Sequence, residues 1–238
     1  MTHRGVLVLA LLGMLATPRA QATAADCDPT DRYEVRDLLG WSVLVNKRFL
    51  GDHPEQADRT LTLLKQQLDQ ITRVVPAESV ESLRTIRIWV EQEDPHHPCM
   101  AYHPDAGWLR EHGMNPEKAR GIEIANARNF RSWTVDQPWM VLHELAHGYH
   151  DQTLEGGFEN AEVRAAYDRA LAAKLYDSVL RIGGEEEKAY ATTNPMEYFA
   201  EASEAFFGTN DFYPFVRAEL RRHDPEMYAL LKKLWHSR

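Results

Sequence analysis

The 238-residue sequence predicts an α+β fold, on the basis of two patterns and the lack of any internal divider. Strand-like segments fall in the first half of the chain, whereas helical spacing of apolar residues dominates from Pro138 onward. No Gly/Ser-rich linker, repeat or low-complexity block interrupts the sequence. We therefore expect a single domain over residues 23–238, with a small mixed sheet and a long helix in its N-terminal part and a mainly helical C-terminal half.

Residues 1–22 have the features of a cleaved signal peptide. Arg4 precedes an apolar run, Gly5–Ala16, which is shorter than the roughly 20 residues that a membrane-spanning helix needs. Ala20-Gln21-Ala22 fits the small-x-small rule for cleavage. An uncleaved anchor or a buried helix is the alternative. We expect cleavage, a secreted or periplasmic location, and no membrane span in the mature protein.

The charge balance argues against nucleic acid as a partner. The chain carries 27 basic and 36 acidic residues, for a formal net charge of −9. Neither a nucleic acid nor an anionic membrane attracts such a protein electrostatically. The balance fits an exported protein that acts on a peptide or protein, although it also fits a surface that is charged for solubility alone.

The two cysteines, Cys27 and Cys99, predict a disulfide, because exported proteins reach an oxidising compartment. Cys99 lies in a segment, residues 95–103, that also holds three histidines and two prolines. A second metal site is the alternative for this segment. The histidines lack helical spacing and the prolines interrupt regular structure, which favours a loop.

In the first half, the sequence predicts a long amphipathic helix that starts at Pro54 and ends before Pro76. Strands are predicted on either side of it, and one long ordered loop lies between the last two strands. The strands are Tyr33–Leu39, Trp41–Leu50, Arg84–Glu91 and Gly121–Ala125, and the loop is Asp94–Pro116. If Gly121–Ala125 were an edge strand, it could pair with an extended peptide. A buried strand without that role is an equal alternative.

The second half predicts helices that start at proline or at a capping residue and end at glycine. One helix begins at Pro138, a second runs from Asn160 to Ile182, and a third runs from Asn194-Pro195 to near Gly208. Further helices are predicted over Pro214–Arg222 and Pro225–His236.

The segment that most clearly indicates a catalytic or metal site is His143-Glu144-Leu145-Ala146-His147. Two imidazoles four residues apart on a helix share one face, about 6 Å apart along the axis. From there both can bind one zinc ion. Glu144 lies beside the metal and can take a proton from water and pass it to a leaving amine. Two surface or core-edge histidines without a metal are the alternative.

A catalytic zinc site needs a third protein ligand. The class with a third histidine six residues after the second is excluded, because that position is Thr153. Two sets of carboxylates remain, and an acidic surface without a metal explains either set equally simply. The sets are Glu155, Glu159 and Glu162, and the helical stripe Glu197, Glu201 and Glu204. The stripe lies on a helix with an apolar face, so a plain amphipathic helix with a solvated acidic face is the alternative. We favour the stripe as the source of the ligand, because the two histidines need one more.

The two histidines, taken with the segment Tyr190–Ala202, resemble the peptidase domain of the anthrax lethal factor family, which includes the secreted Pro-Pro endopeptidases. The segment reads Tyr-x-x-Thr-Asn-x-x-Glu-(aromatic)-Phe-Ala-Glu-Ala, and the resemblance covers about 70 residues, Pro138–Phe207. It implies a zincin-like fold and a zinc site of the gluzincin type, which has a glutamate as third ligand.

The resemblance also implies roles for individual residues. Glu197 falls on the third zinc ligand, and Glu201 on a carboxylate that orients a ligand imidazole. Tyr190 falls on a tyrosine whose hydroxyl stabilises the oxyanion of the reaction. Pro195 and Met196 stand where residues near the ligand vary in the family, and the loop Asp94–Pro116 has no counterpart there, so cleavage specificity does not carry over.

Together these observations predict a zinc metalloendopeptidase in which Glu144 is the general base for a metal-activated water. Two other functions fit the same residues. One is a catalytically silent zinc domain that binds a peptide, although metal binding alone needs neither Glu144 nor Tyr190. The other is a zinc hydrolase of a non-protein amide, such as a cell-wall cross-link.

Overall fold

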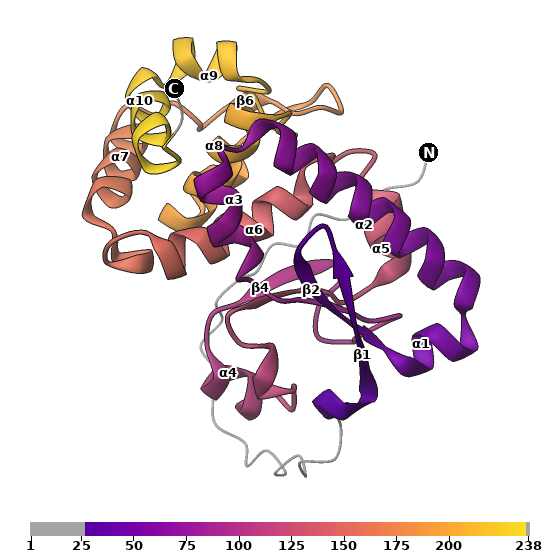
Figure 1. The fold of residues 1–238 in the computed structure, drawn as a ribbon. Helices are drawn as coiled ribbons and strands as arrows, with labels where there is room; N and C mark the ends of the chain where they lie inside the picture. Colours follow the sequence, from indigo (N-terminus) through magenta and orange to yellow (C-terminus); the bar gives the residue numbers. More distant parts are fainter. Residues whose placement is uncertain (1–26, 237–238) are drawn as a thin grey trace, which may run out of the picture.

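A computed structural model describes residues 27–236. The predicted signal peptide, residues 1–22, lies outside this range. As predicted, the fold is α+β, with a small mixed sheet and a predominantly helical C-terminal half. Figure 1 shows the sheet at one end of the molecule and helices α7 to α10 at the other, with α6 between them.

Five strands form the main sheet in the order β1-β2-β3-β5-β4. Their bounds are Tyr33–Leu38 (β1), Trp41–Asn46 (β2), Ile88–Val90 (β3), Met100–His103 (β4) and Gly121–Ile124 (β5). The three central strands are parallel, and the outer strands β1 and β4 run antiparallel to their neighbours. Leu39 and Gly40, with φ of 59° and 92°, make the tight turn between β1 and β2.

Of the two alternatives for Gly121–Ala125, an edge strand that pairs with peptide or a buried strand, the structure has the buried strand. This segment forms β5, which is paired on both sides, with β3 and β4. The edge strand next to β5 is β4, which arises from the segment predicted to be a loop. Residues 94–116 therefore contain a strand and also a short helix, α4 (Ala106–Glu111), whose first turn is capped when Asp105 accepts a hydrogen bond from the Trp108 amide. The prolines and histidines of this segment obscure the apolar spacing typical of strands and helices, so neither element was predicted.

Two predicted strands are longer than the strands in the structure, because a helix takes up part of each predicted segment. Asn46 accepts a hydrogen bond from the Arg48 amide at 2.9 Å, and this cap starts helix α1 (Lys47–Asp52) inside the predicted strand Trp41–Leu50. Helix α3 (Ala77–Arg84) was not predicted, and it leaves only Ile88–Val90 as strand in the predicted Arg84–Glu91.

The long helix is confirmed as α2 (Pro54–Val74), and α8 (Pro195–Phe207) starts and ends as predicted. The other helices are α5 (Ala127–Trp133), α6 (Met140–Thr153), α7 (Ala161–Ala172), α9 (Arg217–His223) and α10 (Pro225–Leu234). The helix predicted from Asn160 to Ile182 is wrong beyond Ala172. Lys174 takes a left-handed φ of 55°, and Val179–Leu180 (β6) pairs with Glu186–Glu187 (β7).

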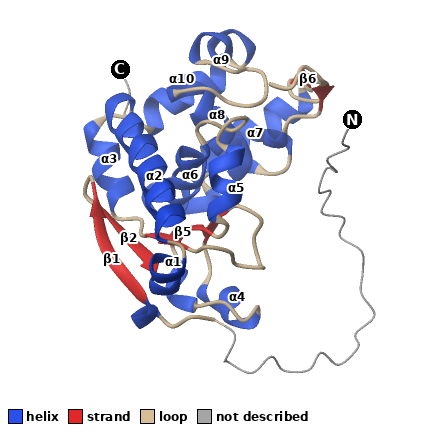
Figure 2. Ribbon diagram, turned by 90° about the vertical axis from the view of Figure 1, so that its right-hand side faces the viewer, coloured by secondary structure: helices blue, strands red, loops and turns tan. Residues whose placement is uncertain are grey.

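The main hydrophobic core lies between one face of the sheet and helices α2, α3, α6 and α8. Helix α6 contacts α2, α3 and α8, among which it is seen in Figure 2, and it packs closely on the sheet at Gly148. A Cβ at that position would lie 2.6 Å from Ile86 Cδ1 and 3.2 Å from Tyr102 Cε2. Glycine therefore lets the metal-motif helix approach β4.

The opposite face of the sheet carries a buried polar cluster, which we call the Lys118 cluster. Lys118 is an ion partner of Glu91 at 2.9 Å and of Glu123, and His103 is 2.7 Å from Glu123. Tyr33 donates a hydrogen bond to Glu91. These contacts join all four of β1, β3, β4 and β5 to the turn that carries Lys118.

The predicted disulfide between Cys27 and Cys99 is not formed, and both cysteines are free. Cys99 is buried in the main core, where its sulfur lies 3.9 Å from the sulfur of Met140. Its thiol therefore faces α6 and the core. Over residues 27–236, no helix combines the length and apolar character needed to cross a membrane.

Replacing Lys118 by methionine is expected to destabilise the fold by about 3–5 kcal/mol, because it leaves two buried carboxylates without their cation. The side chains of Lys118 and Glu123 are 3% and 0% exposed, so water cannot compensate. Urea unfolding followed by circular dichroism measures the change. Lys65→Met, at an exposed position of α2, is the control. Equal stabilities for the two variants would contradict the structural role of the Lys118 cluster.

Candidate metal centre

Helix α6 presents the metal motif at the centre of the molecule. It starts at Met140 and buries the residues between and beside its two histidines, including Val141, Leu142 and Leu145. The apolar side of this helix packs into the core, so His143 and His147 are held on the side that faces α8. Their rings lie edge to face, with centroids 4.8 Å apart.

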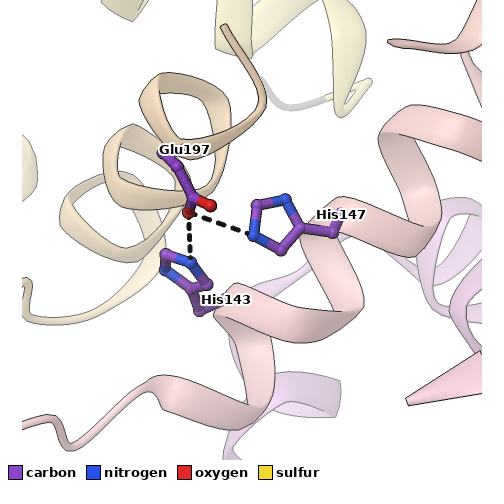
Figure 3. Close-up of side chains that lie close together, drawn as sticks. All are labelled: His143, His147 and Glu197. Carbon is purple, nitrogen blue, oxygen red and sulfur yellow. Dashed lines mark hydrogen bonds and ion pairs between the residues drawn. The ribbon is translucent and has the colours of Figure 1, made fainter. Parts of the chain in front are cut away.

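One carboxylate of α8 meets both imidazoles (Figure 3). Glu197 Oε2 lies 3.0 Å from His143 Nε2 and 3.2 Å from His147 Nε2. The α8 N-cap fixes the start of the helix that carries Glu197, because Asn194 accepts a hydrogen bond from the Glu197 amide at 2.9 Å. Three donors from two helices therefore converge on one point.

This convergence fits a metal ion. The ligand atoms of His143, His147 and Glu197 all lie within 4.8 Å of one another. Two imidazole nitrogens and one carboxylate oxygen are the donor types of catalytic zinc sites. Among residues 27–236, one other group of three meets the same criterion, namely His143 with Glu201 and Glu204. The histidines of residues 95–103 belong to neither group.

The alternative third ligands lie elsewhere on the surface. Glu159 pairs with Arg164 at 3.0 Å, and Glu162 pairs with Lys233 at 2.6 Å. Glu155 is exposed. The structure therefore brings the favoured stripe on α8 to the histidines, and leaves the other three acids apart from them.

Glu144 points towards the edge strand. Its Oε2 accepts a hydrogen bond from the backbone amide of Tyr102 in β4, at 2.8 Å. One carboxylate oxygen is thus fixed by the sheet edge, beside the two imidazoles of the same helix. This contact also ties the middle of α6 to β4.

Tyr190 lies at the rim of the site, in the short 3-10 turn Tyr190–Thr192 that precedes α8. Its hydroxyl is 3.5 Å from Glu197 Oε1, at the outer limit of a hydrogen bond, and its ring is 6.5 Å from that of His143. Burial of the hydroxyl end and the negative charge of Glu197 raise the pKa of Tyr190 to about 12. At neutral pH the phenol therefore keeps its proton and can donate it in a hydrogen bond.

The two further acids of the stripe make different contacts. His143 Nδ1 lies 2.7 Å from Glu204 Oε1 and 3.8 Å from Glu201 Oε1, so Glu204 is the hydrogen-bond partner of the imidazole. Sequence reasoning placed Glu204 in the stripe and gave it no role. The usable signal was its spacing, because residues 197, 201 and 204 share one face of a helix.

Contacts among these side chains shift the pKa values of the candidate ligands in opposite directions. Burial works against both charged forms. Even so, hydrogen bonds with the two imidazoles hold the pKa of Glu197 well below its usual range, and hydrogen bonds to Glu197 and Glu204 raise the pKa of His143. Burial raises the pKa of both Glu201 and Glu204. A divalent cation bound between these groups would supply positive charge beside the carboxylates.

The site opens into a cleft of about 440 Å³. Its walls are mainly apolar and rich in sulfur and aromatic groups, and its charged lining residues are acids and histidines. The apolar lining includes Cys99, Met100, Tyr102, Trp133, Met140, Phe158 and Met196, and the acids are Glu144, Glu197 and Glu204. No lysine or arginine is among the residues that line it in the described part of the chain.

Comparison with known proteins supports a metallopeptidase. Residues 124–236 match the family model described as glucose-regulated metallo-peptidase M90. This range includes both histidines of the motif and the whole acidic stripe. The chain thus resembles a metal-dependent peptidase family over the part that carries the candidate centre.

A solved structure, the Pro-Pro endopeptidase from Paenibacillus alvei, is similar over 76% of this chain and 90% of its own, with 19% identity and a TM-score of 0.43. No curated protein sequence matches the chain. The specific kinship to the lethal factor family stays a prediction.

Replacing Glu197 by glutamine is expected to weaken metal binding by more than about 100-fold, because partners outside the ligand shell alone are worth 10- to 100-fold. Competition with a chromogenic chelator measures the zinc dissociation constant. Glu159→Gln removes a carboxylate whose side chain is 80% exposed and should leave the constant unchanged. Equal zinc affinity for both variants would mean that Glu197 is not a ligand.

Proposed function

We propose that the protein is a zinc metalloendopeptidase that hydrolyses extended peptide or protein segments. The metallopeptidase family match supports metal-dependent peptide hydrolysis. The choice of zinc rests on the donor set of two imidazoles and one carboxylate. The observation that carries the proposal is the convergence of His143 Nε2, His147 Nε2 and Glu197 Oε2 beside the carboxylate of Glu144, within an open cleft.

Different side chains of the site can carry out the different steps of peptide hydrolysis. A zinc ion held by the two histidines and Glu197 would supply Lewis-acid polarisation of the scissile carbonyl and would acidify water. Glu144 accepts a proton from the attacking water and later donates it to the leaving amine. The Tyr102 amide holds one of its oxygens and leaves the other for this transfer. Tyr190, protonated at neutral pH, donates a hydrogen bond to the developing oxyanion.

The edge strand β4 is the proposed docking site for substrate backbone. It is the last strand of the sheet, and Met100, Ala101 and Tyr102 line the cleft. The amide of Tyr102 points away from β5, into the cleft. Glu144 occupies that amide, so a substrate in extended form would pair with the other backbone groups of β4 that face away from β5. The cleft supports an endopeptidase, because no lysine or arginine lines it to hold the terminal carboxylate of a peptide, within the described residues.

We further propose that the protein acts outside the cytoplasm, in the secreted or periplasmic space. This rests on the sequence of residues 1–22 and on the acidic charge of the chain. Detection of the mature N-terminus by mass spectrometry after expression with its own leader tests it.

Glu144→Gln is expected to lower peptide cleavage by about 100- to 10,000-fold, the usual contribution of a general base. Zinc content should stay at the wild-type level, because Glu144 does not point at the converging ligand atoms. The assay is mass spectrometry of a proteome-derived peptide mixture after digestion by each zinc-loaded protein. Equal cleavage by both proteins would exclude the proposed mechanism. Cleavage by neither would favour a binding domain.

The acidic lining predicts a substrate preference. Peptides with leucine or methionine on either side of the scissile bond should have a kcat/KM at least about 10-fold higher than the same peptides with glutamate there, because a buried unpaired carboxylate is costly in free energy. Matched fluorogenic peptides measure the ratio. A preference for glutamate would show that a cationic group, absent from the described cleft lining, takes part in binding.

A further inference from the structure

The imidazole of His143 lies between two carboxylates of helix α8. Its Nε2 is 3.0 Å from Glu197, and its Nδ1 is 2.7 Å from Glu204 Oε1. These glutamates are seven positions apart, which corresponds to about two helical turns, or roughly 10 Å along the axis. One ring is therefore held at both of its nitrogens, and each nitrogen has a different partner.

Glu201 lies between these two glutamates in the sequence but has another partner. Its Oε2 accepts a hydrogen bond from Asn210 Nδ2 at 3.1 Å, and Asn210 also donates to the carbonyl of Phe212 at 3.0 Å. The remaining oxygen is 3.8 Å from His143 Nδ1, which is too far for a hydrogen bond. Glu201 therefore fastens the segment after α8 to the helix.

Burial makes both contacts specific. Glu201 is 4% exposed and Glu204 is 3% exposed, so neither side chain can turn to water for its hydrogen bonds. An unpaired buried carboxylate is expensive, so each of them keeps the donor it has found. The two residues share helix, face and burial, and they differ in the group that they hold.

We propose that Glu204, rather than Glu201, is the positioning residue for the metal ligand His143. This inference rests on the proposed metal site. With its Nδ1 proton donated to Glu204, the ring carries its free electron pair on Nε2, the nitrogen that faces Glu197 and His147. The hydrogen bond to a carboxylate also fixes the ring plane and makes Nε2 a stronger donor.

The consequence for binding follows from the chemistry of the partner group. A glutamine at position 204 keeps the size of the side chain but loses its charge. Its amide can also turn its NH₂ group towards the ring, which favours the wrong tautomer of His143. Outer partners of this kind are typically worth about 10- to 100-fold in metal affinity.

The test compares Glu204→Gln with Glu201→Gln in the full-length mature chain. Chelator competition measures the zinc dissociation constant of each, and circular dichroism checks that the metal-free proteins fold. We expect a 10- to 100-fold loss of zinc affinity for Glu204→Gln and less than about a threefold change for Glu201→Gln. An equal or larger loss for Glu201→Gln, or none for Glu204→Gln, would overturn the proposal.

A second measurement uses the wild-type protein, in case either variant fails to fold. Nitrogen-15 NMR of the zinc-loaded, histidine-labelled protein should show His143 bound through Nε2, with a proton retained on Nδ1. Metal bound through Nδ1 would overturn the proposal. Neither experiment contains a substrate, so failure to cleave any peptide would defeat the proposed function and leave this comparison intact.

Discussion

The convergence of side chains at the candidate centre depends on the packing of α6 against α8. The two helices come from segments about 50 residues apart, and each contributes part of one small polar site inside an apolar interface. Two imidazole nitrogens of α6 lie 3.0 and 3.2 Å from a single carboxylate oxygen of α8. Such buried polar groups need their partners, because polar groups buried without hydrogen bonds or charges to match them destabilise a fold.

The rest of the fold holds α6 in the place that this site needs. Gly148 lets the helix lie close to the sheet, and the Tyr102 amide of β4 binds Glu144. The strand that supplies this amide is kept in the sheet by β5 and by the Lys118 cluster behind it. A chain of contacts thus runs from the Lys118 cluster, on the face of the sheet opposite the main core, through the edge strand β4 to the proposed general base Glu144.

Part of the candidate centre could be predicted from sequence. Helical spacing puts His143 and His147 on one face, and the Asn194-Pro195 start signal puts Glu197 in the first turn of a capped helix. The choice of Glu197 as third ligand rests on the family resemblance. The partner of His143 could not be predicted. Glu201 and Glu204 share a face, and only tertiary packing decides which of them reaches the imidazole. The fold class and the long helices were predictable for the same reason of periodicity. Strand β4 was not, because its four residues lie among prolines and histidines, and its pairing with β5 is a long-range contact.

The most direct test of the account is the position of the metal. Crystals of the zinc-loaded protein, measured on both sides of the zinc absorption edge, would place the ion by its anomalous signal. The account predicts one ion bound by His143 Nε2, His147 Nε2 and a carboxylate oxygen of Glu197, with Glu204 on His143 Nδ1. An ion bound by Glu204 or by Glu201 in place of Glu197, or no ion between the two histidines, would contradict it.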